Sequence, residues 1–217
     1  MMVSSANDAA AVIAEHVGGD QETFVAMMNQ RAMELGCKNT NFSNATGISA
    51  QGQYSTARDL AVITQAALRN ETFAKIFSTV NYTVAKTNKS DARELVTSNN
   101  MMRPANKDYF DARITGGKTG YTSAAGRCLA TTAESEDSDM KLICVILGAE
   151  EYINEVKEVN SVKLKKNDRY IEAYLTYLYC KNKMESMNGW NDGESFKKMM
   201  SAYPEYTVEI HKMKEPE

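Results

Sequence analysis

Residues 116–128 read Gly-Gly-Lys-Thr-Gly-Tyr-Thr-Ser-Ala-Ala-Gly-Arg-Cys, and no other segment constrains the fold as strongly. It combines four glycines with Lys118 and several hydroxyl side chains, and it runs directly into the apolar Leu129 and Ala130. Glycine allows another backbone or a ligand to approach closely, and lysine supplies a point charge with three donors. We therefore predict a strand edge against which an anionic group lies.

A phosphate-binding loop is the first alternative for this segment. The Walker pattern requires a glycine five residues before Gly-Lys-Thr, where this chain has Ala112. It also requires a helix after the lysine, so that the helix N-terminus faces the phosphate. Residues 122–133 are instead rich in Thr, Ala and Gly, residues 142–147 are apolar after Lys141, and the polar residues 134–139 lie between the two segments. This pattern predicts an antiparallel hairpin, and it excludes the nucleotide-binding interpretation.

The second informative segment is the N-terminal Ser-Ser-Ala-Asn-Asp at residues 4–8, which precedes a helical pattern. One interpretation is a helix N-cap, because Ser, Asn and Asp side chains accept hydrogen bonds from the free amides of a first turn. The other is a functional Ser-x-Asn element formed by Ser5 and Asn7. The later Lys118-Thr119-Gly120 favours the second interpretation.

A Ser-x-Asn element followed by Lys-Thr-Gly resembles the second and third motifs of the penicillin-recognising serine acyl-transferases. Residues 35–47, 54–61 and 117–128 are similar to segments of one group among them. That group is the low-molecular-weight penicillin-binding proteins, the serine-type D-alanyl-D-alanine carboxypeptidases. The similarity extends from residue 1 to about residue 148. It implies an α+β (mixed α/β) fold of the β-lactamase/transpeptidase type, in which helices flank an antiparallel sheet, here incomplete at the N-terminus.

The resemblance implies a peptidoglycan stem peptide ending in D-Ala-D-Ala as substrate, and β-lactams as ligands of the full-length family. A serine attacks the carbonyl between the two D-alanines, releases the terminal one, and leaves an acyl-enzyme for water to hydrolyse. The implied site consists of two groups of residues. Lys118, Thr119 and Gly120 would bind the substrate carboxylate. The catalytic group would be Ser5 for proton transfer, Asn7 for the substrate amide, and the Tyr121 backbone N–H as an oxyanion donor.

The family's nucleophile lies in a Ser-x-x-Lys motif upstream of the Ser-x-Asn element. Only four residues precede Ser5, so the motif cannot occupy that position here. Ser138 with Lys141 and Ser195 with Lys198 match the spacing, and we interpret both as chance. The first spans a turn and a strand start, where a spacing of three does not align side chains, and the second follows both other motifs. We expect an N-terminally shortened carboxypeptidase, inactive by itself and without its signal peptide.

Two other functions remain open. A non-catalytic module that recognises muropeptides would keep the carboxylate site without cleaving the peptide. A related serine β-lactamase or endopeptidase would share the same motifs.

Composition limits the remaining classes. With 217 residues and 43% hydrophobic content, the chain can bury the core of one domain, which we place at residues 1–186, followed by a C-terminal extension at 187–217. The net charge of −3 argues against a nucleic-acid partner. No stretch approaches the roughly 20 apolar residues of a transmembrane segment. The family implies an extracytoplasmic location, in the cell wall or on the outer face of the bacterial membrane.

Cysteines and histidines are too few and too scattered for a metal site, and we predict no cofactor. They are Cys37, Cys128, Cys144, Cys180, His16 and His211. If the hairpin turn centres near residue 136, Cys128 and Cys144 lie about opposite one another. A disulfide is then conceivable, although small buried side chains are favoured and the pairing stays open.

Hydrophobic periodicity and caps predict the remaining elements. Helices are expected at residues 7–17, 20–35, 55–68, 71–78, 150–159 and 169–183. Further strands are expected at residues 80–84 and 206–210. Residues 39–53 read as a loop on a cleft rim, and residues 86–108 as a loop with a short helix. The methionines of residues 20–35 are expected to fill the core.

Overall fold

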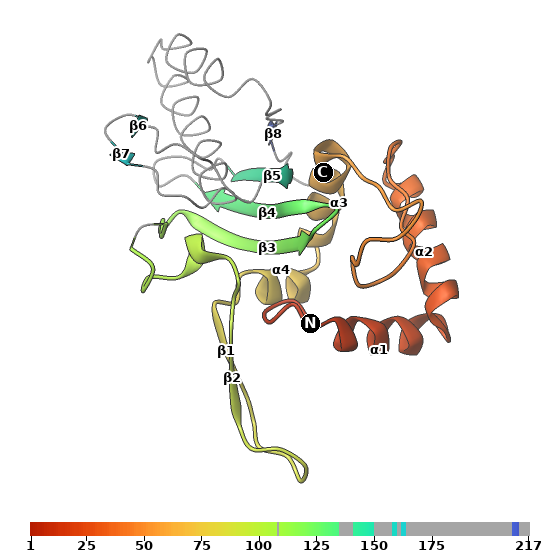
Figure 1. The fold of residues 1–217 in the computed structure, drawn as a ribbon, viewed down its shortest axis with the longest axis horizontal. Helices are drawn as coiled ribbons and strands as arrows, with labels where there is room; N and C mark the ends of the chain where they lie inside the picture. The colour runs from red at the N-terminus through yellow and green to blue at the C-terminus, as the bar shows by residue number, and fades with distance from the viewer. Residues whose placement is uncertain (108, 135–140, 150–157, 160–161, 164–209, 213–217) are drawn as a thin grey trace.

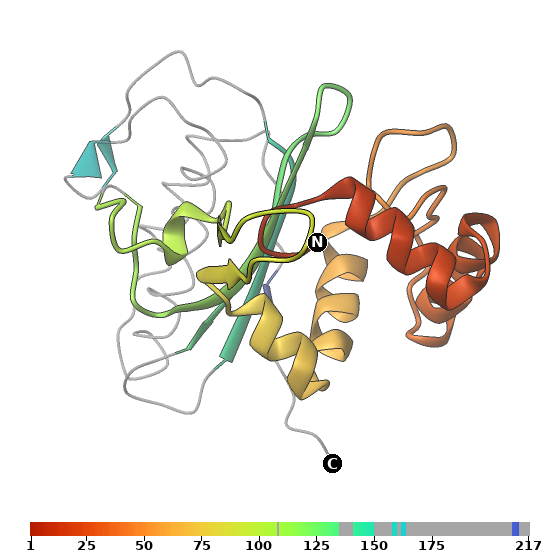
Figure 2. The same cartoon turned by 90° about the horizontal axis from the view of Figure 1, so that it is seen from below.

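The computed structural model describes residues 1–107, 109–134, 141–149, 158–159, 162–163 and 210–212. An antiparallel sheet stands at the centre, with helices on one of its faces and a short helical segment on the other (Figures 1 and 2). This is the predicted α+β arrangement. The order of the described elements agrees closely with the sequence patterns.

All four helices expected before residue 80 are present. They are α1 (Asn7–Gly18), α2 (Gln21–Glu34), α3 (Ala57–Leu68) and α4 (Glu71–Phe77). The side chain of Asp20 caps α2 by accepting a hydrogen bond from the Thr23 amide at 2.7 Å, and Thr56 caps α3 in the same way. These bonds satisfy backbone donors that have no partner within the helix.

The start of α1 is different. Its N-cap residue is Ala6, which provides no side-chain hydrogen bond. The N-cap interpretation of residues 4–8 is therefore wrong, because α1 begins without the side-chain cap that this segment could have provided. The hydroxyl of Ser5 contacts another part of the molecule, as described below.

Three consecutive strands form the body of the sheet. Its described strands are β3 (Ile114–Thr122), β4 (Gly126–Glu134), β5 (Lys141–Ala149) and β8 (Ile210–Lys212), in the order β3-β4-β5-β8 with antiparallel pairing throughout. The predicted hairpin of two strands around residues 134–139 is thus confirmed. The predicted edge position of the Lys-Thr-Gly strand is also confirmed among the described strands.

Both faces of this sheet are covered. On one face, Ala61 of α3 packs with Ile143 and Val145 of β5. On the other face, Met101 and Met102 of the 3-10 helix η1 (Asn100–Met102) pack into a cluster with strand residues Ile114 and Leu129. Figure 2 shows α3 and α4 on one side of the sheet and η1 on the other. The edge strand β3 is therefore held from both sides.

The predicted register of the two cysteines is wrong. Glu134 lies opposite Lys141, which centres the turn between residues 137 and 138 rather than at 136. Cys144 consequently lies opposite Thr131, and the register is irregular between Arg127 and Leu129, next to Cys128. Cys128 and Cys144 form no disulfide with each other. The later turn centre moves every cross-strand partner, so the geometry for a disulfide between them is absent.

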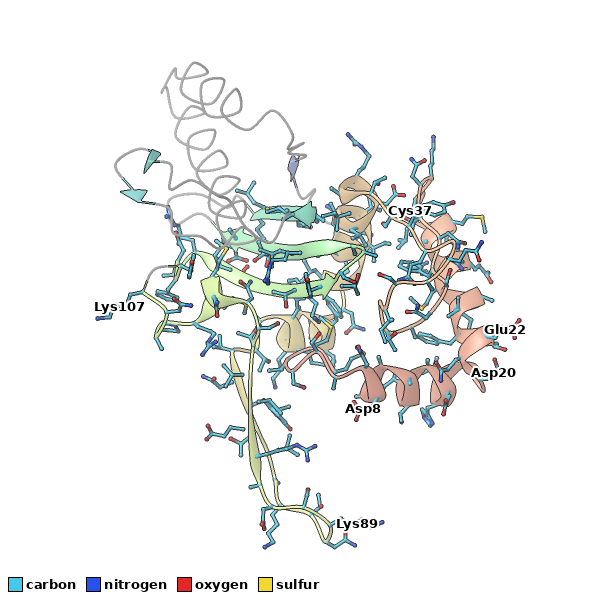
Figure 3. The ribbon with its side chains drawn as sticks, viewed as in Figure 1. Asp8, Asp20, Glu22, Cys37, Lys89 and Lys107 are labelled. Atoms are coloured by element: carbon cyan, nitrogen blue, oxygen red, sulfur yellow. The ribbon has the colours of Figure 1, made fainter. Side chains whose placement is uncertain are left out.

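The ribbon formed by β1 (Asn81–Val84) and β2 (Arg93–Val96) projects away from the body. Lys89 lies at its tip (Figure 3). The strand at 80–84 was predicted, but β2 was not, because we expected a loop there. β2 pairs only with β1 and has no fully buried residue, so its sequence needs no apolar alternation.

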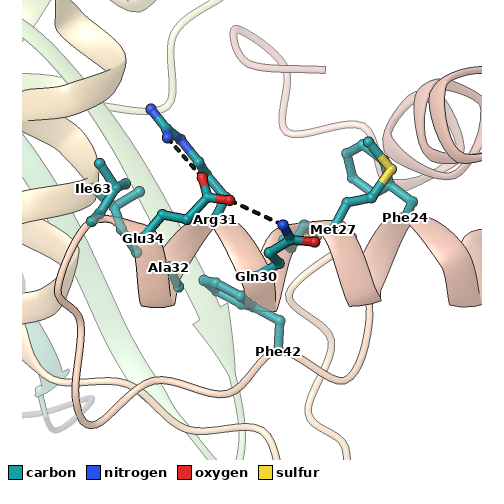
Figure 4. A pocket seen from close by; sticks show the side chains of 10 residues that line it. Phe24, Met27, Gln30, Arg31, Ala32, Glu34, Phe42 and Ile63 are labelled. Atoms are coloured by element: carbon teal, nitrogen blue, oxygen red, sulfur yellow. Dashed lines mark hydrogen bonds and ion pairs between the residues drawn. The ribbon is translucent and has the colours of Figure 1, made fainter.

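The predicted packing of α2 is partly wrong. Of its residues only Ala32 is buried, while Met27 is 45% exposed. The apolar side chains of α2 line an open cavity of about 530 Å³ with Phe42 and Ile63 (Figure 4). Met27 therefore does not fill the core.

Beside the cavity, a hydrogen bond from Arg31 holds the pKa of Glu34 below its usual value.

The other predictions fall largely outside the described residues. Of the helix expected at 150–159, only Glu158–Val159 is described, and it forms strand β6 paired with β7 (Val162–Lys163). The helix at 169–183, residues 206–209, Ser138, Ser195 and Cys180 lie outside them. The division at residue 186 stays a prediction. Within the described residues, no helix is long and apolar enough to cross a membrane.

Candidate functional site

Consecutive glycines allow β3 to be packed tightly from its two faces. A Cβ on Gly116 would lie 2.3 Å from the ring of Phe77, and a Cβ on Gly117 would lie 2.3 Å from Nδ2 of Asn99. Successive residues of a strand point to opposite faces, so α4 contacts one face and the residues before η1 contact the other. A Cβ on Gly120 would meet only Cys128, at 3.6 Å. The first two glycines therefore serve packing, and only the third leaves open space.

Lys118 follows these glycines and contacts the N-terminal segment. Its Nζ donates a hydrogen bond to Oγ of Ser5 at 2.6 Å, across 113 residues of sequence. It also donates to the backbone carbonyl of Thr119. Figure 2 shows the N-terminal segment passing the sheet before α1 begins. The Ser-x-Asn element and the Lys-Thr-Gly strand are thus in direct contact through Ser5 and Lys118.

The backbone of Ser5 has an unusual conformation. Its φ is +58°, and among the described residues it is the only one other than glycine with a positive φ. L-residues adopt this left-handed region at a cost, and such positions are concentrated at functional sites. The turn reverses the chain just before α1, where the Ala6 amide donates to the Met1 carbonyl at 3.3 Å. It leaves Ser5 exposed on the side of Lys118.

Thr119 is 6% exposed and is bonded to the residues between β2 and η1. Its Oγ1 lies 2.5 Å from Oγ of Ser98. The adjacent Asn99 is fully buried against Gly117 of β3, and its Nδ2 donates to Oγ1 of Thr131 on β4 at 3.3 Å. Residues 86–108 were predicted as a loop with a short helix, which η1 confirms, but the contact of Ser98 with Thr119 was not predicted.

The far end of β3 meets the predicted rim loop. Oγ of Ser49 lies 2.6 Å from Oγ1 of Thr122, which joins residues 39–53 to the strand. Beside this contact, the Tyr121 ring is 50% exposed, and the Arg127 guanidinium carbon lies 5.0 Å from its centroid. The loop, the strand end and the N-terminal segment therefore surround one stretch of the sheet edge.

A family model described as D-alanyl-D-alanine carboxypeptidase matches residues 1–151, which is more than half of the chain. The chain belongs to the D-alanyl-D-alanine carboxypeptidase family. The resemblance based on Ser5, Asn7 and the Lys-Thr-Gly strand is thereby confirmed at the level of the family, including its assignment to the low-molecular-weight penicillin-binding proteins.

Individual comparisons agree with this assignment. The D-alanyl-D-alanine carboxypeptidase DacF of Bacillus subtilis is 36% identical over 182 residues, which are 83% of this chain and 43% of that protein. Penicillin binding protein 5 from Haemophilus influenzae is 34% identical in structure-based comparison, with a TM-score of 0.57 over 68% of this chain and 40% of that one. A D-alanyl-D-alanine carboxypeptidase from Mycobacterium tuberculosis is 30% identical, with a TM-score of 0.58 over 67% of this chain and 52% of that one.

The chain spans less than half the length of the curated relatives it matches. Its similarity to solved structures covers about two thirds of its own residues. The fold and family are thus established for this stretch, whereas the activity of the whole protein is a proposal.

Within this family member, the structure connects three of the predicted site residues and leaves Asn7 and Tyr121 apart from them. Ser5, Lys118 and Thr119 form a connected set through the bonds already described. Asn7 is exposed on the first turn of α1, and its side chain has no hydrogen-bond partner among the described residues. Tyr121 lies beyond Gly120 at the open end of the strand. The roles predicted for these residues stay predictions.

Ser98 and Ser49 were not among the predicted site residues. Ser98 stands in the polar Thr-Ser-Asn-Asn at residues 97–100, and Ser49 stands in a loop of similar composition. Nothing in either local sequence distinguishes a serine that contacts the sheet from one that is exposed only to water. Their positions follow from contacts across 21 and 73 residues, which no local pattern encodes.

Proposed function

We propose that this protein is a serine-type D-alanyl-D-alanine carboxypeptidase, which removes the terminal D-alanine of peptidoglycan stem peptides through an acyl-enzyme. The contact between Ser5 and Lys118 carries the proposal, because it brings a Ser-x-Asn element and a Lys-Thr-Gly strand into one site. The family of the chain supports the same reaction. We also propose that the protein acts outside the cytoplasm and binds β-lactams.

The proposed binding step uses the charge of Lys118. The free carboxylate of the substrate lies along the β3 edge and accepts hydrogen bonds from the Lys118 ammonium and the Thr119 hydroxyl. Charge-assisted bonds of this kind are about twice as strong as neutral ones. Because β3 is an edge among the described strands, a ligand lying along it can reach side chains of both strand faces.

In the proposed chemical step, a serine oxygen attacks the carbonyl carbon of the penultimate D-alanine, and its hydroxyl proton passes to Ser5. The Tyr121 backbone N–H stabilises the oxyanion. Collapse of the tetrahedral intermediate breaks the C–N bond, and Ser5, hydrogen-bonded to Lys118, relays the proton released by the attacking serine to the leaving amine. Asn7 holds the substrate amide. Water then attacks the ester carbonyl, one of its protons returns to the serine oxygen as the C–O bond breaks, and the serine is regenerated.

The attacking serine is not assigned. Among the described residues, no serine is followed three positions later by a lysine. A Ser-x-x-Lys pair would place a lysine one helical turn from the nucleophile. The contacts of Lys118 and Thr119 concern only the proposed carboxylate site, so they also support a second candidate function, a module that binds muropeptides without cleaving them.

The protein encoded by the complete gene should release D-alanine from N-acetyl-L-lysyl-D-alanyl-D-alanine. The measurement compares this release with hydrolysis of a chromogenic cephalosporin and with binding of the same tripeptide. Release that is faster than cephalosporin hydrolysis supports the carboxypeptidase. Binding without release would favour the non-catalytic module, and faster cephalosporin hydrolysis would favour a β-lactamase.

The 217 residues by themselves should acquire no covalent label from a fluorescent penicillin, because acylation needs a serine activated by a neighbouring base. The check is gel fluorescence after incubation, with the protein of the complete gene as a positive control. A labelled band that disappears in Ser138→Ala or Ser195→Ala would contradict our interpretation of these two matches as chance. A band that disappears in Ser5→Ala would assign the nucleophile to the serine beside Lys118.

A further inference from the structure

The bond between Ser98 and Thr119 leads to a role for Ser98 in the proposed carboxylate site. We propose that Ser98 is a positioning residue, which fixes the Thr119 hydroxyl so that its proton points to the substrate carboxylate. This inference rests on the proposed function, because it needs an anionic ligand at Lys118 and Thr119. It adds a residue from outside the Ser-x-Asn and Lys-Thr-Gly motifs.

The geometry of the pair is short and specific. Oγ of Ser98 and Oγ1 of Thr119 are 2.5 Å apart, at the short limit of O–H···O hydrogen bonds. Thr119 is 6% exposed, so its hydroxyl is largely shielded from water. Ser98 is exposed and lies on the solvent side of the pair. A ligand at the strand edge therefore meets the two hydroxyls as one connected unit.

The backbone around Ser98 is anchored on both sides. The Thr97 amide donates to the Val80 carbonyl at 2.8 Å. The Asn99 amide donates to Oγ1 of Thr97 at 3.2 Å, and its side-chain Oδ1 accepts from the Met101 amide at 3.1 Å. Because Asn99 is fully buried, it cannot exchange these partners for water without being exposed. Ser98 is thus presented by a fixed segment rather than by a loose loop.

The number of protons on each hydroxyl determines which of Ser98 and Thr119 donates the hydrogen bond between them. A hydroxyl has one proton to donate and two lone pairs to accept. If Thr119 donates to the carboxylate, it cannot also donate to Ser98, so Ser98 must be the donor within the pair. This donation polarises the Thr119 hydroxyl and strengthens its bond to the anion, as in other hydrogen-bond chains. Without Ser98, the Thr119 proton is free to rotate away from the ligand.

In the test, the isotope-labelled chain is titrated with N-acetyl-L-lysyl-D-alanyl-D-alanine and, separately, with the same peptide carrying a C-terminal carboxamide. Each titration gives a dissociation constant. The ratio of the two dissociation constants reports recognition of the carboxylate and cancels losses common to both ligands. Ser98→Ala is expected to reduce the preference for the acid by about fivefold. Ser98→Cys, which keeps the shape but is a weak donor, should give a similar loss. Ser98→Thr should restore the ratio to within about twofold.

Ser49→Ala is the matched control, because it removes another hydroxyl that is bonded to β3. It should leave the ratio unchanged. An unchanged ratio in both Ser98→Ala and Ser98→Cys, with a wild-type chain that prefers the acid, would overturn the role of Ser98 alone. A wild-type chain with no preference for the acid would overturn the carboxylate site itself and the inference with it.

Discussion

Replacing Lys118 by alanine should lower the rate of acylation by penicillin about 100- to 1,000-fold in the protein encoded by the complete gene. The change removes the cation proposed to hold the ligand carboxylate. It also removes the donor that lies 2.6 Å from Ser5 Oγ, so the proposed proton-transfer residue loses its partner. The second-order rate constant of labelling by a fluorescent penicillin measures the effect.

Lys141→Ala provides the matched control for this experiment. Lys141 lies at the start of β5 in the same sheet, is 57% exposed, and pairs with Glu134 at 3.2 Å. Exposed ion pairs of this kind contribute about 0–1 kcal/mol to stability, so acylation should change less than about twofold. Equal losses in both variants would show that Lys118 acts through general stability. Retained acylation in a folded Lys118→Ala protein would contradict its place in the site.

The sequence was sufficient for the elements whose physical causes are local. Asp20 and Thr56 are N-caps, and α2 and α3 start directly after them, as predicted. The polar run at 134–139 between two apolar strands predicted the hairpin, and the pairing is antiparallel. The pairing of Ser5 with Lys118 was predicted differently. It depended on a resemblance, since periodicity alone assigns Ser5 to a helix cap.

What the sequence did not predict depends on contacts between distant segments. The turn centre lies about one and a half residues later than expected, and this shift is enough to separate Cys128 from Cys144. The cavity beside Met27 forms because the surrounding elements do not fill the apolar face of α2, which a helical pattern cannot reveal. Ser98 contacts Thr119 because the neighbouring Asn99 packs against β3. Asn99 can pack there only because Gly117 has no side chain.

Because Gly117 must lack a side chain, its substitution is expected to have the largest effect on stability. Gly117→Ala should lower the free energy of unfolding by about 2–3 kcal/mol, because overpacking of a tight core typically costs 1–3 kcal/mol. The new Cβ would lie 2.3 Å from Asn99 Nδ2 and 3.2 Å from the Ala130 carbonyl. The midpoint of thermal unfolding should fall by about 5–10 °C, as measured by circular dichroism.

Gly120→Ala in the same strand separates steric overlap from the general effect of adding a methyl group to β3. Its Cβ would meet only Cys128, at an ordinary 3.6 Å, so the midpoint should move by less than about 2 °C. If both variants unfold alike, the contact between Gly117 and Asn99 does not limit stability. If Gly117→Ala alone is destabilised, the double variant Gly117→Ala/Asn99→Ala shows whether Asn99 is the obstacle. Removal of its amide should relieve the clash, so the two changes should cost less together than the sum of their separate losses.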